Sequence, residues 1–156
     1  MLSVLQRVSE ASVSVEGKII GRIGPGLLVL LCAEHGDTEA EADALLAKIL
    51  KLRIFADDNG RMNRSVTDVG GGLLVVSQFT LAADARKGNR PSFTAAASPE
   101  HGRAMYEYFL ERARSSHPIV AGGEFAANMQ VSLVNDGPVT IPLNVAPTHA
   151  ATEVSG

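Results

Sequence analysis

The stretch Gly26-Leu27-Leu28-Val29-Leu30-Leu31-Cys32-Ala33 is an unbroken apolar run that follows the turn residues Gly24-Pro25. A short apolar run bounded by turn residues is typical of a β-strand whose two faces are both buried. A second run of this kind, Leu73 to Val76, follows Gly70-Gly71-Gly72. These two segments predict a β core whose faces are covered by other elements.

Two amphipathic segments are available to cover such a core. Thr38 and Glu41 have the spacing of a capping box, which predicts the start of a helix. Its buried face is then defined by apolar residues at helical spacing: Leu45, Leu46, Ile49 and Leu52. Ser98-Pro99-Glu100 predicts a second helix, because it combines a cap residue, a proline at the first helical position and an acid in the first turn.

The N-terminal region predicts three further strands. Leu2 to Val8 and Ala11 to Val15 read as a hairpin, whose second strand alternates valines with serines. Glu16-Gly17 then predicts a turn into a strand at residues 18–23.

The C-terminal region predicts two strands, Met129 to Val134 and Val139 to Val145, separated by a turn at Asn135-Asp136-Gly137-Pro138. Pro142 lacks a backbone N–H, so we expect the last strand at a sheet edge or an interface. The predicted fold class is α+β: mixed β-sheet layers with two main helices in a single domain. That domain is expected to span residues 1–145, followed by a disordered tail at 146–156.

Composition limits the classes of function. The chain of 156 residues has a net charge of −3 and a pI of about 5.8. Domains that hold long nucleic acids through phosphates alone are usually basic, so DNA is not an expected partner. No apolar run approaches the ~18 residues of a membrane span, and the N-terminus lacks a signal-peptide layout. We therefore expect a cytoplasmic protein without membrane association.

Conventional catalytic patterns do not occur in the sequence. The histidines His35, His101, His117 and His149 lack metal-ligand spacing, and no Gly-x-Ser-x-Gly motif is present. The single cysteine, Cys32, cannot form a disulfide within the chain and is predicted to be a small core residue. No metal and no cofactor are expected.

Two segments with polar residues remain as candidate sites. Ser77, Gln78 and Thr80 surround Phe79 where the second buried strand ends, so their N–H and hydroxyl groups either stabilise an oxyanion or simply cap the strand. Gly137-Pro138 is either a trans proline in a tight turn or a cis bond that aligns neighbouring carbonyls as a rigid acceptor pair. The residues alone leave both alternatives open.

Taken together, Ser77-Gln78-Phe79-Thr80-Leu81 and Asn135-Asp136-Gly137-Pro138-Val139-Thr140 resemble the paired signature of the D-aminoacyl-tRNA deacylase (D-tyrosyl-tRNA deacylase) family. The resemblance covers essentially residues 1–145. It includes these further stretches: Gln6-Arg7-Val8, Ala11-Ser12-Val13, Arg53-Ile54-Phe55, Arg90-Pro91-Ser92-Phe93 and Met129-Gln130-Val131-Ser132-Leu133.

This resemblance implies a hydrolase that cleaves the ester of D-aminoacyl-tRNA, and also of glycyl-tRNA, as a proofreading step in translation. It also implies a homodimer with active sites at the interface, where the Gly-Pro turn of one subunit enters the site of the other. The carbonyls of Gly137 and Pro138, joined by a cis bond in the family, would hold the substrate's α-amino group. An L side chain would collide with this turn, so that enantiomer is rejected by a clash.

The resemblance places Ser77, Gln78, Phe79 and Thr80 around the scissile ester as the catalytic residues. Because no histidine lies near Thr80 in sequence, a mechanism in which the 2′-hydroxyl of the terminal adenosine helps to activate water is favoured over an acyl-enzyme on Thr80.

Other positions carry supporting roles by resemblance. Phe125 and Met129 resemble pocket-lining residues, and Arg7 is expected to brace the Gly-Pro turn. A charged loop is a candidate for contact with RNA phosphates, or is merely solvated; its cations are Arg86, Lys87 and Arg90.

Two other classes of function compete with this hypothesis. A non-catalytic β-rich nucleic-acid-binding module would bind generic nucleic acid without ester hydrolysis, but the acidic pI and the lack of a stacking ladder count against it. An esterase or amidase for free D-aminoacyl compounds would cleave small esters as fast as charged tRNA.

Overall fold

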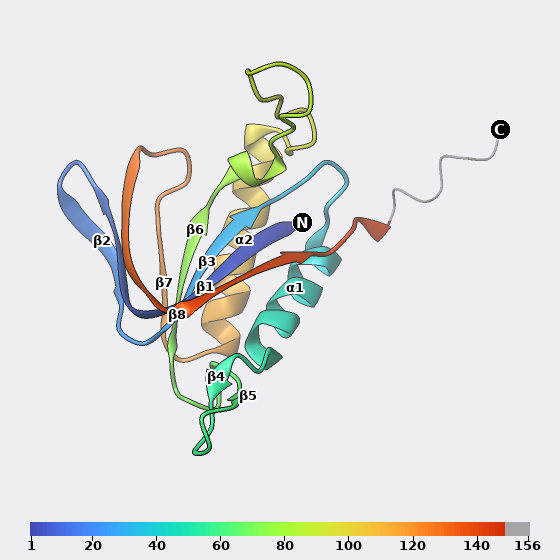
Figure 1. The fold of residues 1–156 in the computed structure, drawn as a ribbon. Helices are drawn as coiled ribbons and strands as arrows, with labels where there is room; N and C mark the ends of the chain where they lie inside the picture. The colour runs from blue at the N-terminus through green and yellow to red at the C-terminus, as the bar shows by residue number, and fades with distance from the viewer. Residues whose placement is uncertain (149–156) are drawn as a thin grey trace.

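A computed structural model describes residues 1–148 of the chain (Figure 1). One six-stranded mixed sheet, a two-stranded ribbon and two long helices make up the fold. The elements are β1 (Leu2–Val15), β2 (Lys18–Ile23), β3 (Gly26–Cys32), α1 (Glu39–Lys51), β4 (Phe55–Ala56), β5 (Met62–Arg64), β6 (Gly72–Ser77), the 3-10 helix η1 (Phe79–Ala82), α2 (Pro99–Ser116), β7 (Val120–Gly122) and β8 (Met129–Asn144). The predicted α+β class is confirmed.

The two apolar runs form β3 and β6, which are neighbours in the middle of the sheet order β2-β1-β3-β6-β7. They pair in parallel, from Gly26 opposite Gly72 to Leu31 opposite Ser77. The backbones approach so closely at the first pair that a Cβ on Gly26 would overlap the carbonyl of Gly72. Glycine is therefore required where these strands begin. The parallel pairing brings the carboxyl ends of both strands to the same end of the sheet.

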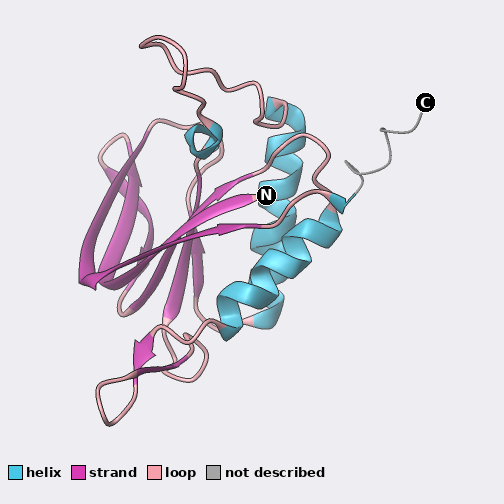
Figure 2. Ribbon diagram, turned by 45° about the vertical axis from the view of Figure 1, so that its right-hand side comes forward, coloured by secondary structure: helices cyan, strands magenta, loops and turns pink. Residues whose placement is uncertain are grey.

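Alternate residues of these strands enter two separate cores, which confirms that both faces are buried. Both long helices lie on one face (Figure 2), where Leu45 and Phe109 pack with Val29 and Val75. On the other face, Leu28 and Leu74 join a smaller cluster that also contains Val8, Val13 and Ile23 of β1 and β2.

The predicted N-terminal hairpin is wrong. Residues 2–15 form one continuous strand, β1, whose first half pairs with β3 and whose second half pairs with β2. The chain reverses only at Glu16 and Gly17, which adopt positive φ values of 51° and 77°. Ser9-Glu10 supplies no such turn geometry, so the strand runs through it.

The predicted turn at Asn135–Pro138 is also wrong, because the chain does not reverse there. β8 runs from Met129 to Asn144 and pairs with β1 on both sides of this segment. Thr140 lies opposite Gln6 and Asn135 opposite Val8, so residues 136–139 bulge out opposite Arg7 alone. We call residues 136–139 the β8 bulge. Within residues 1–148, β8 pairs only with β1, which places Pro142 on an edge strand as expected.

Beyond the last strand, the structure describes only residues 146–148; the remainder of the expected tail, 149–156, lies outside the described residues. Thr148 donates to the buried carboxylate of Glu41 through its N–H and its hydroxyl, at 2.9 and 2.8 Å. Among the helices of residues 1–148, none is long and apolar enough to cross a membrane.

Glu41 also completes the predicted capping box, because it accepts hydrogen bonds from the backbone N–H and hydroxyl of Thr38 at 2.6 and 2.5 Å. Burial by itself would raise the pKa of Glu41, but the hydrogen bonds from Thr38 and Thr148 outweigh it and hold that pKa well below its usual range. The carboxylate is therefore ionised in the folded protein and ties α1 to the chain end.

We expect Glu41→Gln to lower the free energy of unfolding by about 1–3 kcal/mol near neutral pH, because an amide cannot accept all four hydrogen bonds. A depressed folded-state pKa means that the contribution is present above the unfolded-state pKa of about 4.3 and is lost as pH falls through the folded-state value. Urea denaturation should therefore give a constant difference above about pH 5 that shrinks below about pH 4. Glu39→Gln, an exposed acid in the same turn, is the control; an equal effect there would contradict this account.

Candidate functional site

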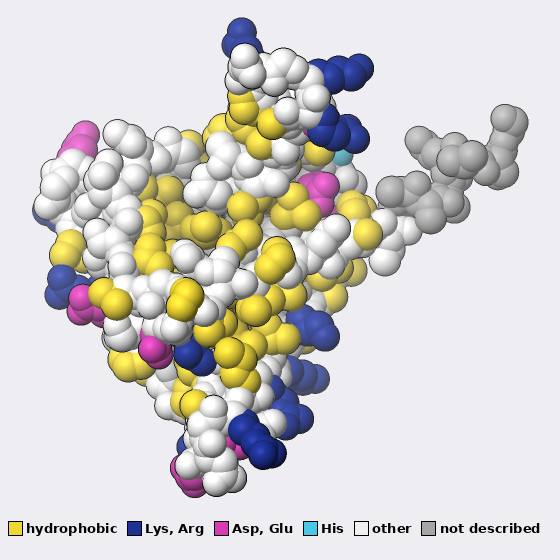
Figure 3. Space-filling view, viewed as in Figure 1, with side chains coloured by type: hydrophobic (Ala, Val, Ile, Leu, Met, Phe, Trp, Pro, Cys, Tyr) yellow, Lys and Arg dark blue, Asp and Glu magenta, His cyan; other side chains and the backbone are white. Residues whose placement is uncertain are grey.

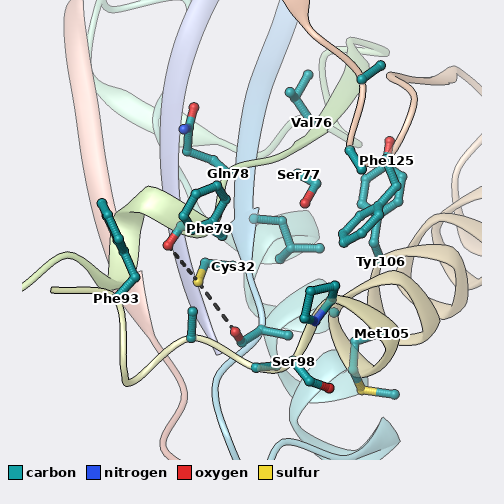
Figure 4. Close-up of a pocket in the computed structure, with 18 of the residues that line it drawn as sticks. Cys32, Val76, Ser77, Gln78, Phe79, Phe93, Ser98, Met105, Tyr106 and Phe125 are labelled. Carbon is teal, nitrogen blue, oxygen red and sulfur yellow. Dashed lines mark hydrogen bonds between the residues drawn. The ribbon is translucent and has the colours of Figure 1, made fainter.

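A pocket of about 570 Å³ lies at the edge where β3 and β6 end (Figure 4). Its walls come from the ends of both strands, the start of α2, and the segments before α2 and before β8. Pockets outside the carboxyl ends of parallel strands are common ligand sites, because rigid strands hold the groups that follow them. The parallel pairing of the two apolar runs therefore fixes where this pocket forms.

The first candidate segment lines the pocket. Ser77 is the last residue of β6, and the backbone N–H of Gln78 donates to Leu31 of β3 at 2.8 Å. Phe79 opens the 3-10 helix with 58% of its surface exposed, although it is a large apolar side chain. Thr80 does not line the pocket; its hydroxyl accepts a 2.5 Å hydrogen bond from Nε2 of Gln78. Strand pairing thus holds this segment at the mouth.

An aromatic wall faces this segment, and it contains the predicted residues Phe125 and Met129. The guanidinium of Arg103 lies 4.9 Å from the centre of the Phe125 ring, and Tyr106 packs against the same ring at 6.1 Å. The hydroxyl of Tyr106 donates to Val75 at 2.9 Å and accepts from the N–H of Gly123 at 3.0 Å. Burial raises the pKa of Tyr106, so the hydroxyl stays protonated and joins the wall to β6.

Most of the other residues that line this pocket, among them the aromatic Phe93 and Tyr106, were not assigned to the site from the sequence. Phe93 meets Phe79 edge to face, with ring centres 5.1 Å apart. Tyr106 lies on the buried face of α2, and helical spacing does not distinguish a core residue from a pocket wall. Phe93 belongs to a stretch that carried the family resemblance, which was the available signal.

Cys32 also lines the pocket, but its side chain is a neutral thiol and not a reactive thiolate. Only 2% of its surface is exposed, and its Sγ lies 3.5 Å from the carbonyl of Phe79. Burial, together with the nearby charge of Glu34, raises the pKa of Cys32 to about 11. The group is therefore neutral near pH 7, which agrees with the prediction of a small core residue rather than a nucleophile.

No charged or imidazole side chain lines the pocket within the part of the chain that the structure describes. His101 and His117 bind the backbone carbonyls of Asp37 and Gly71 instead, at 2.7 and 2.6 Å. Residues 1–148 likewise contain no group of three or more His, Cys, Asp or Glu side chains arranged to hold a metal ion. The pocket can therefore supply hydrogen-bond donors, but it has no general base of its own.

The second candidate segment lies outside this pocket. Gly137 and Pro138, joined by a cis peptide bond, are exposed in the β8 bulge. Arg7 holds the bulge from below: its Nε donates to the carbonyl of Asp136 at 2.9 Å and its Nη1 to that of Ile54 at 2.8 Å. The side chain of Asn135 spans the bulge, accepting from the N–H of Val139 at 3.1 Å and donating to its carbonyl at 3.0 Å.

All but one of the predicted site residues fall into two groups within one chain; Thr80 is hydrogen-bonded to Gln78 but does not line the pocket. Ser77, Gln78 and Phe79 share the pocket with Phe125 and Met129. Arg7, Gly137 and Pro138 form a separate, externally directed group, and Arg7 makes the bracing contacts expected of it.

Comparison with known proteins gives a consistent result. The model of the family described as D-Tyr-tRNA(Tyr) deacylase matches residues 4–144. The D-aminoacyl-tRNA deacylase of Paracidovorax citrulli (strain AAC00-1) is 69% identical over 147 residues, covering 94% of this chain and 95% of that protein. That of Aromatoleum aromaticum (strain DSM 19018 / LMG 30748 / EbN1) is 68% identical over 148 residues, covering 95% and 97%. The family resemblance found in the sequence is confirmed.

Two solved structures share the fold. One titled "c-Myc DNA Unwinding Element Binding Protein" has a TM-score of 0.89 and 43% sequence identity, and the match covers 94% of this chain and 99% of that chain. Another, titled "Structural Analysis of a probable eukaryotic D-amino acid tRNA deacylase", has a TM-score of 0.78 and covers 92% and 98%. Its identity is 18%, so this second likeness concerns the fold alone.

Proposed function

This chain belongs to the D-Tyr-tRNA(Tyr) deacylase family, and from that premise we propose that it hydrolyses the ester between a D-amino acid and tRNA. The products are the free D-amino acid and the tRNA. The observation that carries the proposal is the family match over residues 4–144, which includes both candidate segments. The activity removes D-residues from charged tRNA before they reach translation.

The make-up of the pocket supports an RNA-assisted reaction. Because no carboxylate or imidazole of residues 1–148 lines it, we assign the activation of water to the 2′-hydroxyl of the terminal adenosine. Water attacks the ester carbonyl carbon, the bond from that carbon to the ribose oxygen breaks, and the proton ends on the ribose oxygen. Ser77, Gln78 and Phe79 line the pocket, and we assign the hydroxyl of Ser77 and the backbone N–H of Phe79 as donors to the developing oxyanion. Thr80 has a supporting role, because its hydroxyl is bound by Gln78.

For chiral selection, we assign the β8 bulge of a second subunit to the pocket of the first. The carbonyls of Gly137 and Pro138 would accept the α-amino group, and an L side chain would meet the bulge. Two observations support this role: Gly137 and Pro138 are exposed, and the bulge is braced by Arg7 and Asn135. Glycyl-tRNA, which has no side chain to clash, would also be accepted.

A homodimer is the arrangement that would bring the two groups together. Hydrophobic side chains gather over the strands at the centre of one face (Figure 3). Val131 and Val134 of the edge strand β8 are 36% and 50% exposed, and Phe79 at the pocket mouth is 58% exposed. Large apolar side chains exposed along an edge are typical of a surface that associates.

Binding to DNA is a second candidate function. The observation that favours it is the likeness to the structure titled as a DNA unwinding element binding protein, at 43% identity. The net charge of −3 argues against tight binding through phosphates alone. Hydrolysis of D-tyrosyl-tRNA distinguishes the two functions, because a DNA-binding module would not cleave the ester.

Purified protein should deacylate D-tyrosyl-tRNA rapidly and spare L-tyrosyl-tRNA, because only the L side chain meets the bulge. Release of the amino acid from both substrates, and from glycyl-tRNA, measures the reaction and its filter in one experiment. If neither tyrosyl ester is cleaved, the hydrolase proposal fails. Equal rates on a small D-tyrosyl ester would instead favour an esterase for free D-aminoacyl compounds.

We expect Thr80→Ala to retain kcat/KM within about tenfold of wild type, because Thr80 is not the nucleophile in the proposed reaction. Loss of a nucleophile would typically lower the rate 10³-fold or more. Single-turnover kinetics on D-tyrosyl-tRNA give the value, and thermal denaturation checks the fold. An inactive Thr80→Ala variant, together with an acyl group trapped on wild-type Thr80, would establish an acyl-enzyme instead.

Subunit mixing tests whether the bulge acts on the partner's pocket. Ser77→Ala removes a pocket hydroxyl, whereas Gly137→Ala disturbs the bulge, since its Cβ would lie 2.7 Å from the N–H nitrogen of Val139. Each variant alone should be inactive as a folded dimer. Co-refolded at equal amounts, they should recover about a quarter of wild-type activity, because half of random dimers are mixed and each has one intact site. No recovery, with mixed dimers demonstrated by mass spectrometry, would mean that bulge and pocket act within one chain.

A further inference from the structure

The loop between η1 and α2, residues 83–97, is held firmly at its base although most of it is exposed. Asp84 and Ser92 exchange backbone hydrogen bonds of 2.7 and 2.8 Å, which close the loop into a narrow ring. Farther along, the N–H of Ala97 donates to Ala33 at 3.0 Å. Residues 85–91, which we call the loop tip, are therefore carried on a fixed stem.

The stem of the loop, residues 83–84 and 92–97, forms part of the pocket. Phe93, Ala96 and Ala97 line it, and Phe93 packs against Phe79 of the candidate catalytic segment. The loop tip extends beyond this end of the molecule, away from the ribbon of β4 and β5 (Figures 1 and 2). A polymer whose end enters the pocket would therefore have its next units close to the tip.

The three cationic side chains of the loop differ in whether they have a hydrogen-bond or ion-pair partner. Arg86 is held by Asp84, to which its Nε and Nη2 donate at 2.9 and 2.7 Å. Lys87 and Arg90 have no ion-pair or hydrogen-bond partner among residues 1–148, and both are exposed. Figure 3 shows the Lys and Arg side chains standing out from this loop, at the top of the view. Arg86 therefore belongs to the loop's own structure, whereas Lys87 and Arg90 are available to a ligand.

We propose that Lys87 and Arg90 bind backbone phosphates of the tRNA whose acylated 3′ end occupies the pocket, and so set the register of the acceptor end. This inference rests on the proposed function. Exposed cations lose little solvation when they meet a phosphate, and each such contact releases condensed counterions. Lys87 and Arg90 differ from other exposed cations in their place on the loop that also supplies Phe93, Ala96 and Ala97 to the pocket.

The variant Lys87→Gln/Arg90→Gln tests this assignment, with Lys48→Gln/Lys51→Gln as a matched control. Lys48 and Lys51 are also exposed, but they lie in the last turn of α1, at the end of the molecule remote from the pocket (Figure 1). Two substrates separate the contributions: D-tyrosyl-tRNA, and 3′-O-D-tyrosyl-adenosine, which enters the pocket but carries no phosphate.

For the loop variant we expect kcat/KM on D-tyrosyl-tRNA to fall roughly tenfold, mainly through KM, because two phosphate contacts are lost. The slope of log KM against log salt should decrease by about 1–2. Rates on the nucleoside ester should not change, and the control variant should match wild type on both substrates. Unchanged KM and salt slope on tRNA would overturn the proposal, as would an equal loss on the nucleoside ester.

Binding of uncharged tRNA, measured by fluorescence anisotropy, provides a readout that does not depend on turnover. We expect the loop variant to bind roughly tenfold more weakly than wild type and the control variant. If wild type cleaves no D-ester but this difference persists, the proposed hydrolase function fails and the loop assignment stands. An equal loss of affinity for a DNA duplex of the same length would overturn the assignment to the tRNA acceptor end.

Discussion

The parallel pairing of β3 and β6 is the constraint on which the rest of this structure depends. It requires Gly26 and Gly72 to approach where the strands begin, and it aligns Leu31 with Ser77 where they end. Because both strands point the same way, the segments that follow them must diverge at one edge, and the space between them becomes the pocket. The helices then cover one face of the pair and leave that edge open. A packing requirement of two apolar runs therefore determines the position of the site.

The chemistry of the pocket follows from what such an edge can offer. Strand ends and a short 3-10 helix supply small polar and apolar residues to the lining, and within residues 1–148 they bring no charged or imidazole side chain. Cys32 remains a neutral thiol, and Tyr106 uses its hydroxyl to join β6 to the segment before β8. In the proposed reaction, this site stabilises the developing negative charge, and water and the substrate supply the proton transfers. An ester with a neighbouring hydroxyl, such as the end of a charged tRNA, fits that limitation.

Local sequence signals predicted the parts of the fold that local physics decides. The capping box of Thr38 and Glu41, the Ser98-Pro99 helix start and the two buried strands are all found as expected. The failures lie in β1 and β8, where apparent breaks at Ser9-Glu10 and Asn135–Pro138 do not reverse the chain. Pairing of β1 with three partners carries both strands through those breaks. Such pairing is a long-range property that no short window of sequence contains. Phe93 and Tyr106 were not assigned to the site for the same reason.

The bulge in β8 shows how a sheet can present a fixed, exposed backbone segment without a loop. An ordinary hairpin turn would leave the sheet and depend on its own two strands, whereas the β8 bulge remains paired with β1 on both sides. Arg7 and Asn135 fill the gap with hydrogen bonds to Asp136 and Val139, so the backbone carbonyls of the bulge are fixed by the sheet itself. Rejection by a clash requires an element that does not yield, because a flexible loop would move aside for an L side chain. In the proposed dimer, the edge strand supplies that rigidity, and chiral selection would depend on a second copy of the chain because the bulge lies outside the pocket of its own chain.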